Sequence, residues 1–136
     1  MKYLLDTNVC IGLLNRRPIQ ISVRLQQAWA NGATIFLSCI VLHELFYGAA
    51  KSAHRRANSD AILRLLEETF EVLPFDLEAA KVSGEIRTLL ELKGQRIGEY
   101  DTLTAGQALA LGLTLVTANT REFSRADGLK LVDWTV

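Results

Sequence analysis

The sequence carries no net charge, because 15 lysines and arginines balance 15 aspartates and glutamates. Without an excess of positive charge there is no general attraction for nucleic acid, so such a partner would have to be held by local groups of cations or through a metal ion. Cysteine is nearly absent. Cys10 and Cys39 are single thiols in apolar surroundings, with no CxxC motif. We expect both to be small core residues of a reduced, cytosolic protein.

Long apolar runs are also missing. The run that follows Lys2 has only three residues, too few for a signal peptide. The apolar stretch 40–50 contains His43 and Glu44 and is too short to cross a bilayer. We find no internal repeat, linker or low-complexity segment. With 136 residues, 49% of them hydrophobic, the chain is expected to form one soluble, cytoplasmic domain over residues 1–136, with no membrane partner.

Short apolar runs alternate with helical patterns along the whole chain. This alternation predicts a mostly parallel sheet covered by helices on both faces, a three-layer α/β/α fold. In the longest expected helix, the core positions are Ala80, Ile86, Leu89 and Leu90. Strands are expected at 3–5, 34–37, 71–75, 113–116 and 129–132, and helices at 7–14, 21–30, 39–47, around 62–66, 77–92 and 102–111.

Polar residues follow or flank the expected strands. Asp6 comes directly after the first strand, Glu44 lies in the helix that leaves the second, Asp101 starts the helix before the fourth, and Asn119 follows the fourth. The carboxyl ends of parallel strands share one edge of a sheet, so these residues are able to meet there. Three carboxylates in one crevice repel one another unless a divalent cation joins them. An all-oxygen site suits Mg²⁺ or Mn²⁺.

Each of these residues also has a simpler interpretation. Asp6 and Asp101 are good helix N-caps, and Glu44 has the alternative of facing solvent. Asn119 is a common turn residue. Asp76 follows the third strand too, but capping alone accounts for it, and we leave it out of the site.

Four segments together resemble the PIN domain: LDTN at 5–8, VLHELFYGA at 41–49, IGEYD at 97–101 and VTANTREF at 116–123. The last of these, with residues 128–129 and 133–134, is similar to the VapC toxins of bacterial VapBC toxin–antitoxin modules. The likeness covers essentially the whole chain in the right order. It implies a PIN-like sandwich and a Mg²⁺- or Mn²⁺-dependent endoribonuclease. Such a toxin cleaves RNA, commonly tRNA, and so inhibits translation. It is neutralised by a VapB-type antitoxin and is usually a homodimer that forms a larger assembly with it.

The resemblance also implies roles for individual residues. Asp6, Glu44 and Asp101 would hold the cation directly or through its waters, and Asn119 would complete the catalytic set as a neutral ligand or by orienting a water. Thr7 and Ser38 would donate hydrogen bonds that position the carboxylates or the scissile phosphate. Apart from the resemblance, a chain without net charge would have to hold RNA through local cations. Arg121 is the first candidate, because it lies nearest the proposed site in the sequence. The others are Arg16 with Arg17, residues 54–56, Lys93 with Arg96, and Arg125, and for each the alternative is an ordinary solvated surface charge.

The chain departs from the family pattern at Asn119, where some members have a fourth aspartate that would favour a second metal. Ala118, Glu99 and Thr104 are further departures. Three other classes compete with the nuclease. An aspartyl-phosphate phosphotransferase or a receiver-type domain needs further acids beside the first strand, and Asn8 occupies the position of one of them. A catalytically silent interaction module, whose acids are only helix caps, stays open.

Overall fold

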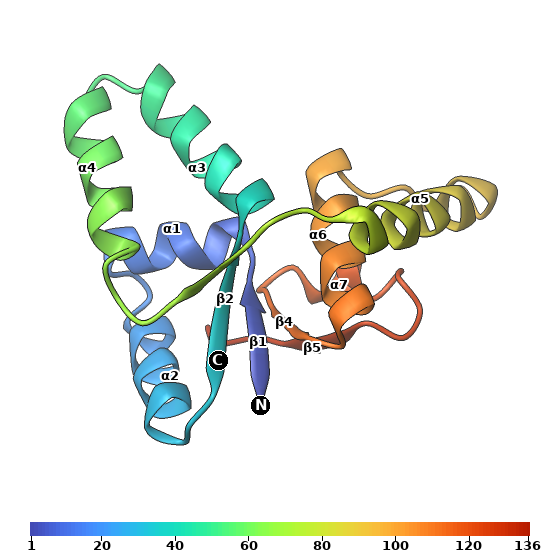
Figure 1. The fold of residues 1–136 in the computed structure, drawn as a ribbon, viewed down its shortest axis with the longest axis horizontal. Coiled ribbons are helices and arrows are strands. Elements are labelled where there is room, and N and C mark those ends of the chain that lie inside the picture. The colour runs from blue at the N-terminus through green and yellow to red at the C-terminus, as the bar shows by residue number, and fades with distance from the viewer.

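Five parallel strands form the central sheet of the computed structural model, which describes residues 1–136. Their order across the sheet is β3-β2-β1-β4-β5, so β1 is the central strand (Figure 1). Each neighbouring pair is parallel. The strands are β1 (Lys2–Leu5), β2 (Thr34–Ser38), β3 (Glu71–Leu73), β4 (Thr114–Val116) and β5 (Lys130–Val132).

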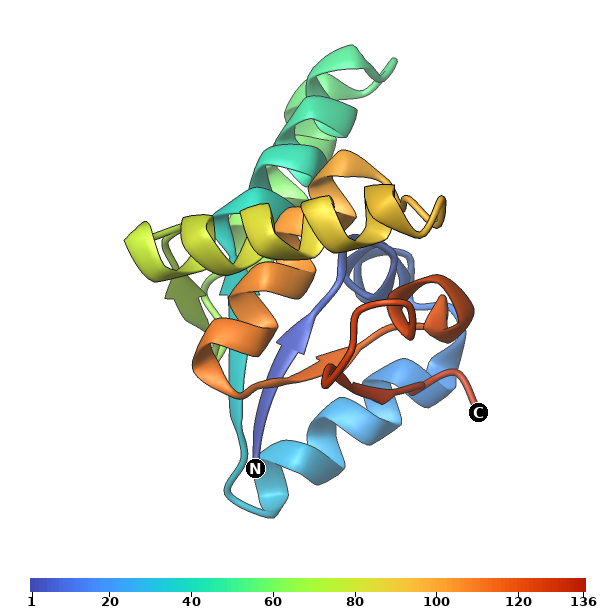
Figure 2. The same cartoon turned by 90° about the vertical axis from the view of Figure 1, so that its right-hand side faces the viewer.

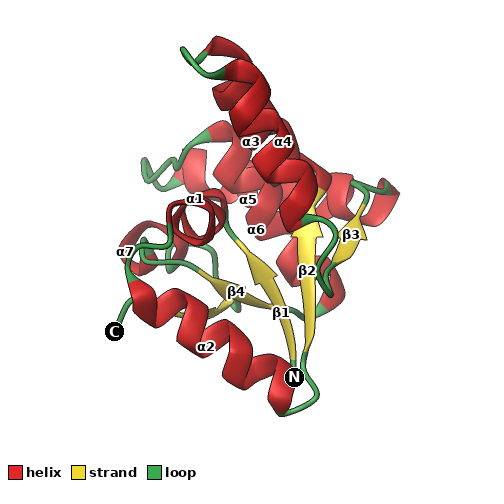
Figure 3. Ribbon diagram, turned by 90° about the vertical axis from the view of Figure 1, so that its left-hand side faces the viewer, coloured by secondary structure: helices red, strands yellow, loops and turns green.

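Helices cover both faces of this sheet, because adjacent residues of a strand point to opposite sides. Leu5 belongs to a core cluster with residues of the first four helices, which cover one face (Figure 3). Leu4 belongs to a second cluster with residues of the last three, which cover the other (Figure 2). The predicted three-layer fold is therefore confirmed. The helices are α1 (Thr7–Asn15), α2 (Ile19–Ala30), α3 (Cys39–Lys51), α4 (Arg55–Leu65), α5 (Leu77–Leu92), α6 (Glu99–Leu111) and α7 (Thr120–Phe123).

The strand order reverses between β1 and β4. From β1 the chain runs outward to β2 and β3, then crosses back to place β4 on the other side of β1. Leu5 pairs with Val116, and the amide of Asp6 donates to the carbonyl of Val116 at 3.1 Å. At such a reversal the following helices diverge to opposite faces and open a crevice at the carboxyl ends of the strands. The candidate site lies there.

The helix α6 begins earlier than expected. Its N-cap is Gly98 rather than Asp101, so Asp101 lies within the first turn together with Glu99. Two carboxylates near a helix amino terminus are favoured by the helix dipole, which explains the earlier start. The interpretation of Asp101 as a simple N-cap is thus wrong. The expected turn at 117–120 also leads directly into α7, a short helix that the sequence did not suggest.

The expected core face of α5 is wrong at two positions. Leu89 is 53% exposed and Ala80 is also exposed, whereas Ile86 and Leu90 are buried as expected. The buried face continues through Ala79 and Ser83. Ser83 lies against Gly106 of α6. Close contact between small residues, rather than the largest apolar side chains, therefore sets which face of α5 is inside.

The two cysteines have different environments. Cys10 is fully buried, and burial raises the pKa of its thiol, with the nearby charge of Asp6 as a smaller cause. Cys39 is exposed, contrary to expectation, because it is the first residue of α3 and lies on the solvent side of that turn. Only Cys10 is a core residue.

Both tryptophans pack against other aromatic rings. Trp134 is 2% exposed and meets Tyr3 of β1 edge-on, with ring centroids 5.2 Å apart. Trp29 of α2 lies 5.1 Å from the ring of Phe70 and donates through Nε1 to the carbonyl of Thr69 at 2.9 Å. These contacts fix the C-terminal segment on the central strand and α2 beside the approach to β3. None of the helices combines the length and hydrophobicity needed to cross a membrane.

Candidate active site

Asp6 is both a helix cap and a site residue. Its Oδ1 accepts a hydrogen bond from the amide of Val9 at 2.8 Å, which caps α1. The side chain is 6% exposed. Burial is the main reason that the pKa of Asp6 is raised, and the charge of Glu44 adds to it, while hydrogen bonds from Thr117 and Val9 act in the opposite direction. The capping role and the position beside other acids therefore occur together.

Glu44 lies partly buried in the second turn of α3. Its Oε1 accepts a hydrogen bond from the hydroxyl of Thr7 at 2.7 Å. Thr7 does donate to a carboxylate, as expected. This bond joins the first residue of α1 to α3 and holds Glu44 toward Asp6. The alternative in which Glu44 points freely into solvent is wrong.

Asp101 brings the acids of several elements into one electrostatic cluster. Its pKa is raised to about 6, first by burial and then by the charges of Glu44, Asp6 and Glu122. A carboxylate is affected in this way only by like charges that lie close to it. The strands β1, β2 and β4 are parallel, so the residue after β1, the helix after β2, the start of the helix before β4 and the helix after β4 lie at one edge of the sheet. We call the side chains of Asp6, Glu44, Asp101 and Glu122 the acid cluster.

Glu122 is the member that the sequence reasoning missed. It lies in the first turn of α7, and its Oε2 accepts from Nδ2 of Asn119 at 2.9 Å. Asn119, which we expected to act as a ligand or to orient a water, uses its amide nitrogen to orient Glu122. The signal was the glutamate three residues after Asn119. In a turn a glutamate at that spacing has no fixed direction, and only the short helix α7 places it beside Asn119.

Ser38 makes different contacts from those expected. Its Oγ caps α3 by accepting from the amide of Ile40 at 2.9 Å, which confirms the predicted N-cap. Its proton, however, goes to Oε1 of Gln107, a fully buried residue of α6. Gln107 in turn donates to the carbonyl of Pro74 at 3.3 Å. Ser38 is therefore committed to a buried network between β2, α6 and the segment after β3, and makes no hydrogen bond with the carboxylates.

Comparison with known proteins decides the family. The PIN domain family model matches residues 3–129, and proteins named VapC match almost the whole chain. The chain belongs to the PIN-domain family, within its VapC branch.

Similar proteins match this PIN domain over nearly its full length. It is 37% identical over 135 residues to the tRNA(fMet)-specific endonuclease VapC of Shigella flexneri, covering 99% of each chain. It is 40% identical over 134 residues to the protein of the same name from Salmonella typhimurium, covering 98% of each. The crystal structure of VapBC2 from Rickettsia felis, bound to a DNA fragment from its promoter, has a TM-score of 0.91 at 39% identity, with 98% of this chain and 99% of that chain covered.

No basic side chain of the PIN domain neutralises the acid cluster. The three ion pairs of the structure are Arg87–Glu91, Lys93–Asp127 and Arg96–Glu91, all outside the cluster. Arg121 is exposed on α7, next to Glu122, and has no ion-pair partner. The other candidate cations fall into two groups. Four are exposed and make no ion pair: Arg16, Arg17, Arg55 and Arg56. The rest already have partners, because Lys93 and Arg96 pair with acids and Arg125 donates to the carbonyl of Arg96 at 3.0 Å.

The donor chemistry of the acid cluster fits a hard divalent cation, because every side-chain ligand it offers is a carboxylate oxygen. No three acidic, histidine or cysteine side chains lie close enough to enclose a metal ion by themselves. Mg²⁺ does not need such an enclosure, since it usually keeps several waters and contacts the protein through one or two carboxylates. The site therefore provides negative charge that no basic side chain neutralises, and a bound metal ion would keep some of its waters there.

Proposed function

We propose that this protein is a metal-dependent endoribonuclease and the toxin of a type II toxin–antitoxin pair. The observation that carries the proposal is the acid cluster, four carboxylates without a counter-cation at the switch point of a parallel sheet. The relatives named as tRNA(fMet)-specific endonucleases support RNA, and tRNA in particular, as the substrate. Cleavage of tRNA would inhibit translation.

The bound metal would be Mg²⁺ or Mn²⁺, held by Asp6, Glu44 and Asp101 directly or through waters, with Glu122 beside them. When bound, it supplies an activated water and neutralises charge that develops on the phosphoryl oxygens. The chain's own donors hold the acids in place for this. The amide of Val9 holds Asp6, Thr7 holds Glu44, and Asn119 holds Glu122. Such supporting hydrogen bonds fix the orientation of ligands before a metal arrives.

Arg121 would contact the RNA backbone. It lies one residue before Glu122, is exposed and is free of ion pairs. A guanidinium in that position offers planar, paired donors to a phosphate of the bound strand. Because the net charge of the chain is zero, such local contacts and the metal together would have to supply the attraction for RNA.

The partners would be a VapB-type antitoxin and a second copy of the chain. The VapBC complexes among the similar structures support the antitoxin. For the second copy, the last turn of α5 exposes Leu89 and Leu92, at 53% and 80%, and its first residue Leu77 is 79% exposed. Exposed apolar side chains near one another, such as Leu89 and Leu92, favour an interface. Co-purification with the antitoxin and light scattering of the free protein would measure both.

Replacing Asp6 with asparagine tests the nuclease. Asparagine caps helices as well as aspartate does, so Asp6→Asn keeps the bond from Val9 and the fold. It removes the charge that the metal needs, and we expect RNA cleavage to fall by more than about a hundredfold. Asp76→Asn is the matched control, because Asp76 caps α5 through the amide of Ala79 at 2.9 Å, and it should cleave normally.

Two results would contradict the proposal. One is a folded Asp6→Asn protein that cuts RNA at the wild-type rate. The other is wild-type cleavage that persists after EDTA has removed divalent ions. A silent interaction module would cut no RNA with or without metal. Mapping of cleavage sites on total cellular RNA after expression would identify the target.

A further inference from the structure

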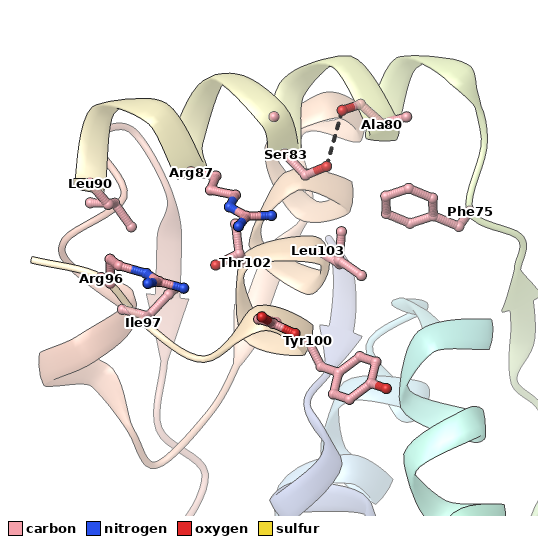
Figure 4. A pocket seen from close by; sticks show the side chains of 12 residues that line it. Phe75, Ala80, Ser83, Arg87, Leu90, Arg96, Ile97, Tyr100, Thr102 and Leu103 are labelled. Carbon is pink, nitrogen blue, oxygen red and sulfur yellow. Dashed lines mark hydrogen bonds between the residues drawn. The ribbon is translucent and has the colours of Figure 1, made fainter. Parts of the chain in front are cut away.

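A pocket of about 410 Å³ lies between α5 and the first turns of α6 (Figure 4). That size falls within the range of pockets that hold small ligands, about 300 to 1,000 Å³. Its apolar walls include Phe75 and Leu103, and its polar groups include Arg87, Arg96 and Glu99. Nothing in the nuclease mechanism above uses this pocket.

Tyr100 connects the pocket to the acid cluster. It lines the pocket on the side of α3, and its side chain points toward that helix (Figure 4). There its hydroxyl lies 3.5 Å from Nε2 of His43, with ring centroids 5.5 Å apart. His43 and Tyr100 directly precede Glu44 and Asp101 in the chain. The first turn of α6 thus carries Asp101 toward the cluster and places the Tyr100 ring, 45% exposed, at the edge of the pocket that faces α3. A helix is only about 10 Å across, so the two side chains lie close together.

The charges of the pocket favour a base over a phosphate. Figure 4 shows the guanidinium groups of Arg87 and Arg96 turned into the pocket from two sides. Both arginines pair with Oε1 of Glu91, which lies 3.0 Å from Nε of Arg87 and 3.9 Å from Nε of Arg96. The charge of Glu99 also helps to raise the pKa of Arg87, after Glu91. These acids offset the positive charge, so the pocket does not concentrate it. Arginine donors and a glutamate acceptor are groups that bind base edges, and aromatic rings stack on unpaired bases.

We propose that this pocket binds the unpaired base of a nucleotide close to the scissile phosphate, stacked against Tyr100. The inference rests on the proposed ribonuclease function and names a structural requirement of its substrate. RNA must be single-stranded at that nucleotide, because a base held in a duplex cannot enter a pocket beside a helix. His43 of α3 lies against the other side of the Tyr100 ring.

The test varies the substrate and the protein together. RNA oligonucleotides spanning a mapped cleavage site would each carry one nucleotide without its base. For the wild-type protein, we expect one such position to lower kcat/KM by about tenfold to a hundredfold, the usual effect of losing one stacked base. Tyr100→Ala should lower cleavage of the intact RNA by a similar factor. Removing the base should then have little further effect, because both changes delete the same contact.

Two further variants serve as controls. Tyr100→Phe keeps the ring and should retain both the activity and its dependence on the base. Tyr47→Ala removes a tyrosine of α3 that is 59% exposed and does not line the pocket, with Nζ of Lys51 4.6 Å above its ring centroid, and should behave as wild type. Circular dichroism would check the fold of each variant. Should Tyr100→Ala fail to fold, the wild-type and Tyr100→Phe series with the modified RNAs still give the answer.

The outcomes separate the two proposals. Wild-type cleavage that is indifferent to base removal at every position near the cut would overturn the base pocket and leave the nuclease standing. Full additivity of the two changes would also overturn it. Binding of the same RNAs is also measured in EDTA, because binding can be followed without any cleavage. A protein that binds with the base penalty but never cuts would support the pocket and refute the nuclease.

Discussion

A carboxylate that ionises among other carboxylates lowers the stability of the fold that holds it. Asp101 is in this position, with a pKa raised to about 6 from an ordinary value of 3.8. Because the folded state binds its proton more tightly than the unfolded state does, the associated stability is present in full below about pH 4. It is lost as the pH rises through about 6. The site therefore stores unfavourable charge at neutral pH.

Asp101→Asn should relieve this repulsion. Without divalent ions and at about pH 7.5, we expect the variant to have a free energy of unfolding about 1 to 2 kcal/mol above wild type, a figure reduced for solvent screening of a partly exposed group. The difference should shrink as the pH falls from about 6 to about 4, since wild-type Asp101 then takes up its proton. Urea unfolding in EDTA over that range measures it. A variant less stable than wild type at every pH would contradict the repulsion.

The hydroxyl of Thr7 is the other residue-scale test. Thr7→Val keeps the shape of the side chain but removes the hydrogen bond to Glu44. We expect about a tenfold to hundredfold loss of RNA cleavage or of apparent metal affinity, as for other groups that orient metal ligands. Thr88→Val removes an exposed threonine bond to the carbonyl of Gly84, far along α5, and serves as the matched control. Equal activity in the two variants would show that Glu44 needs no support from Thr7.

At the scale of elements, the contact between α5 and α6 is unusually close. A Cβ added to Gly106 would lie 2.5 Å from Cβ of Ser83 and 2.9 Å from its backbone nitrogen. Backbone atoms cannot move aside cheaply, so we expect Gly106→Ala to destabilise the protein by about 1 to 3 kcal/mol. Gly84→Ala, in α5 with open space around the added carbon, should stabilise it by about 0.5 to 1 kcal/mol. Thermal unfolding of both variants would measure this, and equal midpoints would disprove the contact.

The contact between Ser83 and Gly106 also explains why the sequence alone does not predict the buried face of α5. Short apolar runs bounded by polar turn residues identified the strands, because a parallel strand buried on both faces is recognised by its continuous apolar sequence. Hydrophobicity could not identify Ser83 as a buried position of α5, since the partner that admits it is a glycine 23 residues later. Glu122 escaped for a related reason. A helix of four residues, α7, in a polar segment has too few positions to show a periodicity.

The acids of β1, α3 and α6 were identified more readily, because the topology of a parallel sheet brings its carboxyl ends together whatever the loops do. Their supporting groups were harder to foresee. Ser38 shared the expected profile of Thr7, a hydroxyl next to a strand end, yet its bond goes to Gln107. Which hydroxyl faces an acid depends on how α6 packs, and local sequence patterns do not predict that packing.

For the whole molecule, the acid cluster predicts that a metal stabilises the fold. Mg²⁺ or Mn²⁺ at about a hundred times its dissociation constant should add about 2.7 kcal/mol to the free energy of unfolding. The gain should vanish in Asp6→Asn and weaken below about pH 6, because Asp101 must lose its proton to act as a ligand. Thermal unfolding with each ion, and after EDTA, measures it. Equal stabilisation of the wild type and Asp6→Asn would assign the ion to another surface.

The two tryptophans give the protein intrinsic fluorescence signals from two different regions of the fold. Trp134 is buried against Tyr3 of the central strand, whereas Trp29 lies partly exposed beside Phe70 at the sheet edge near β3. In a Trp29→Phe protein the emission comes from Trp134 alone and shifts to longer wavelength when the sheet itself comes apart. In a Trp134→Phe protein the remaining signal follows the contact of α2 with the segment before β3. Each fluorophore therefore follows a different part of the same unfolding reaction without any added label.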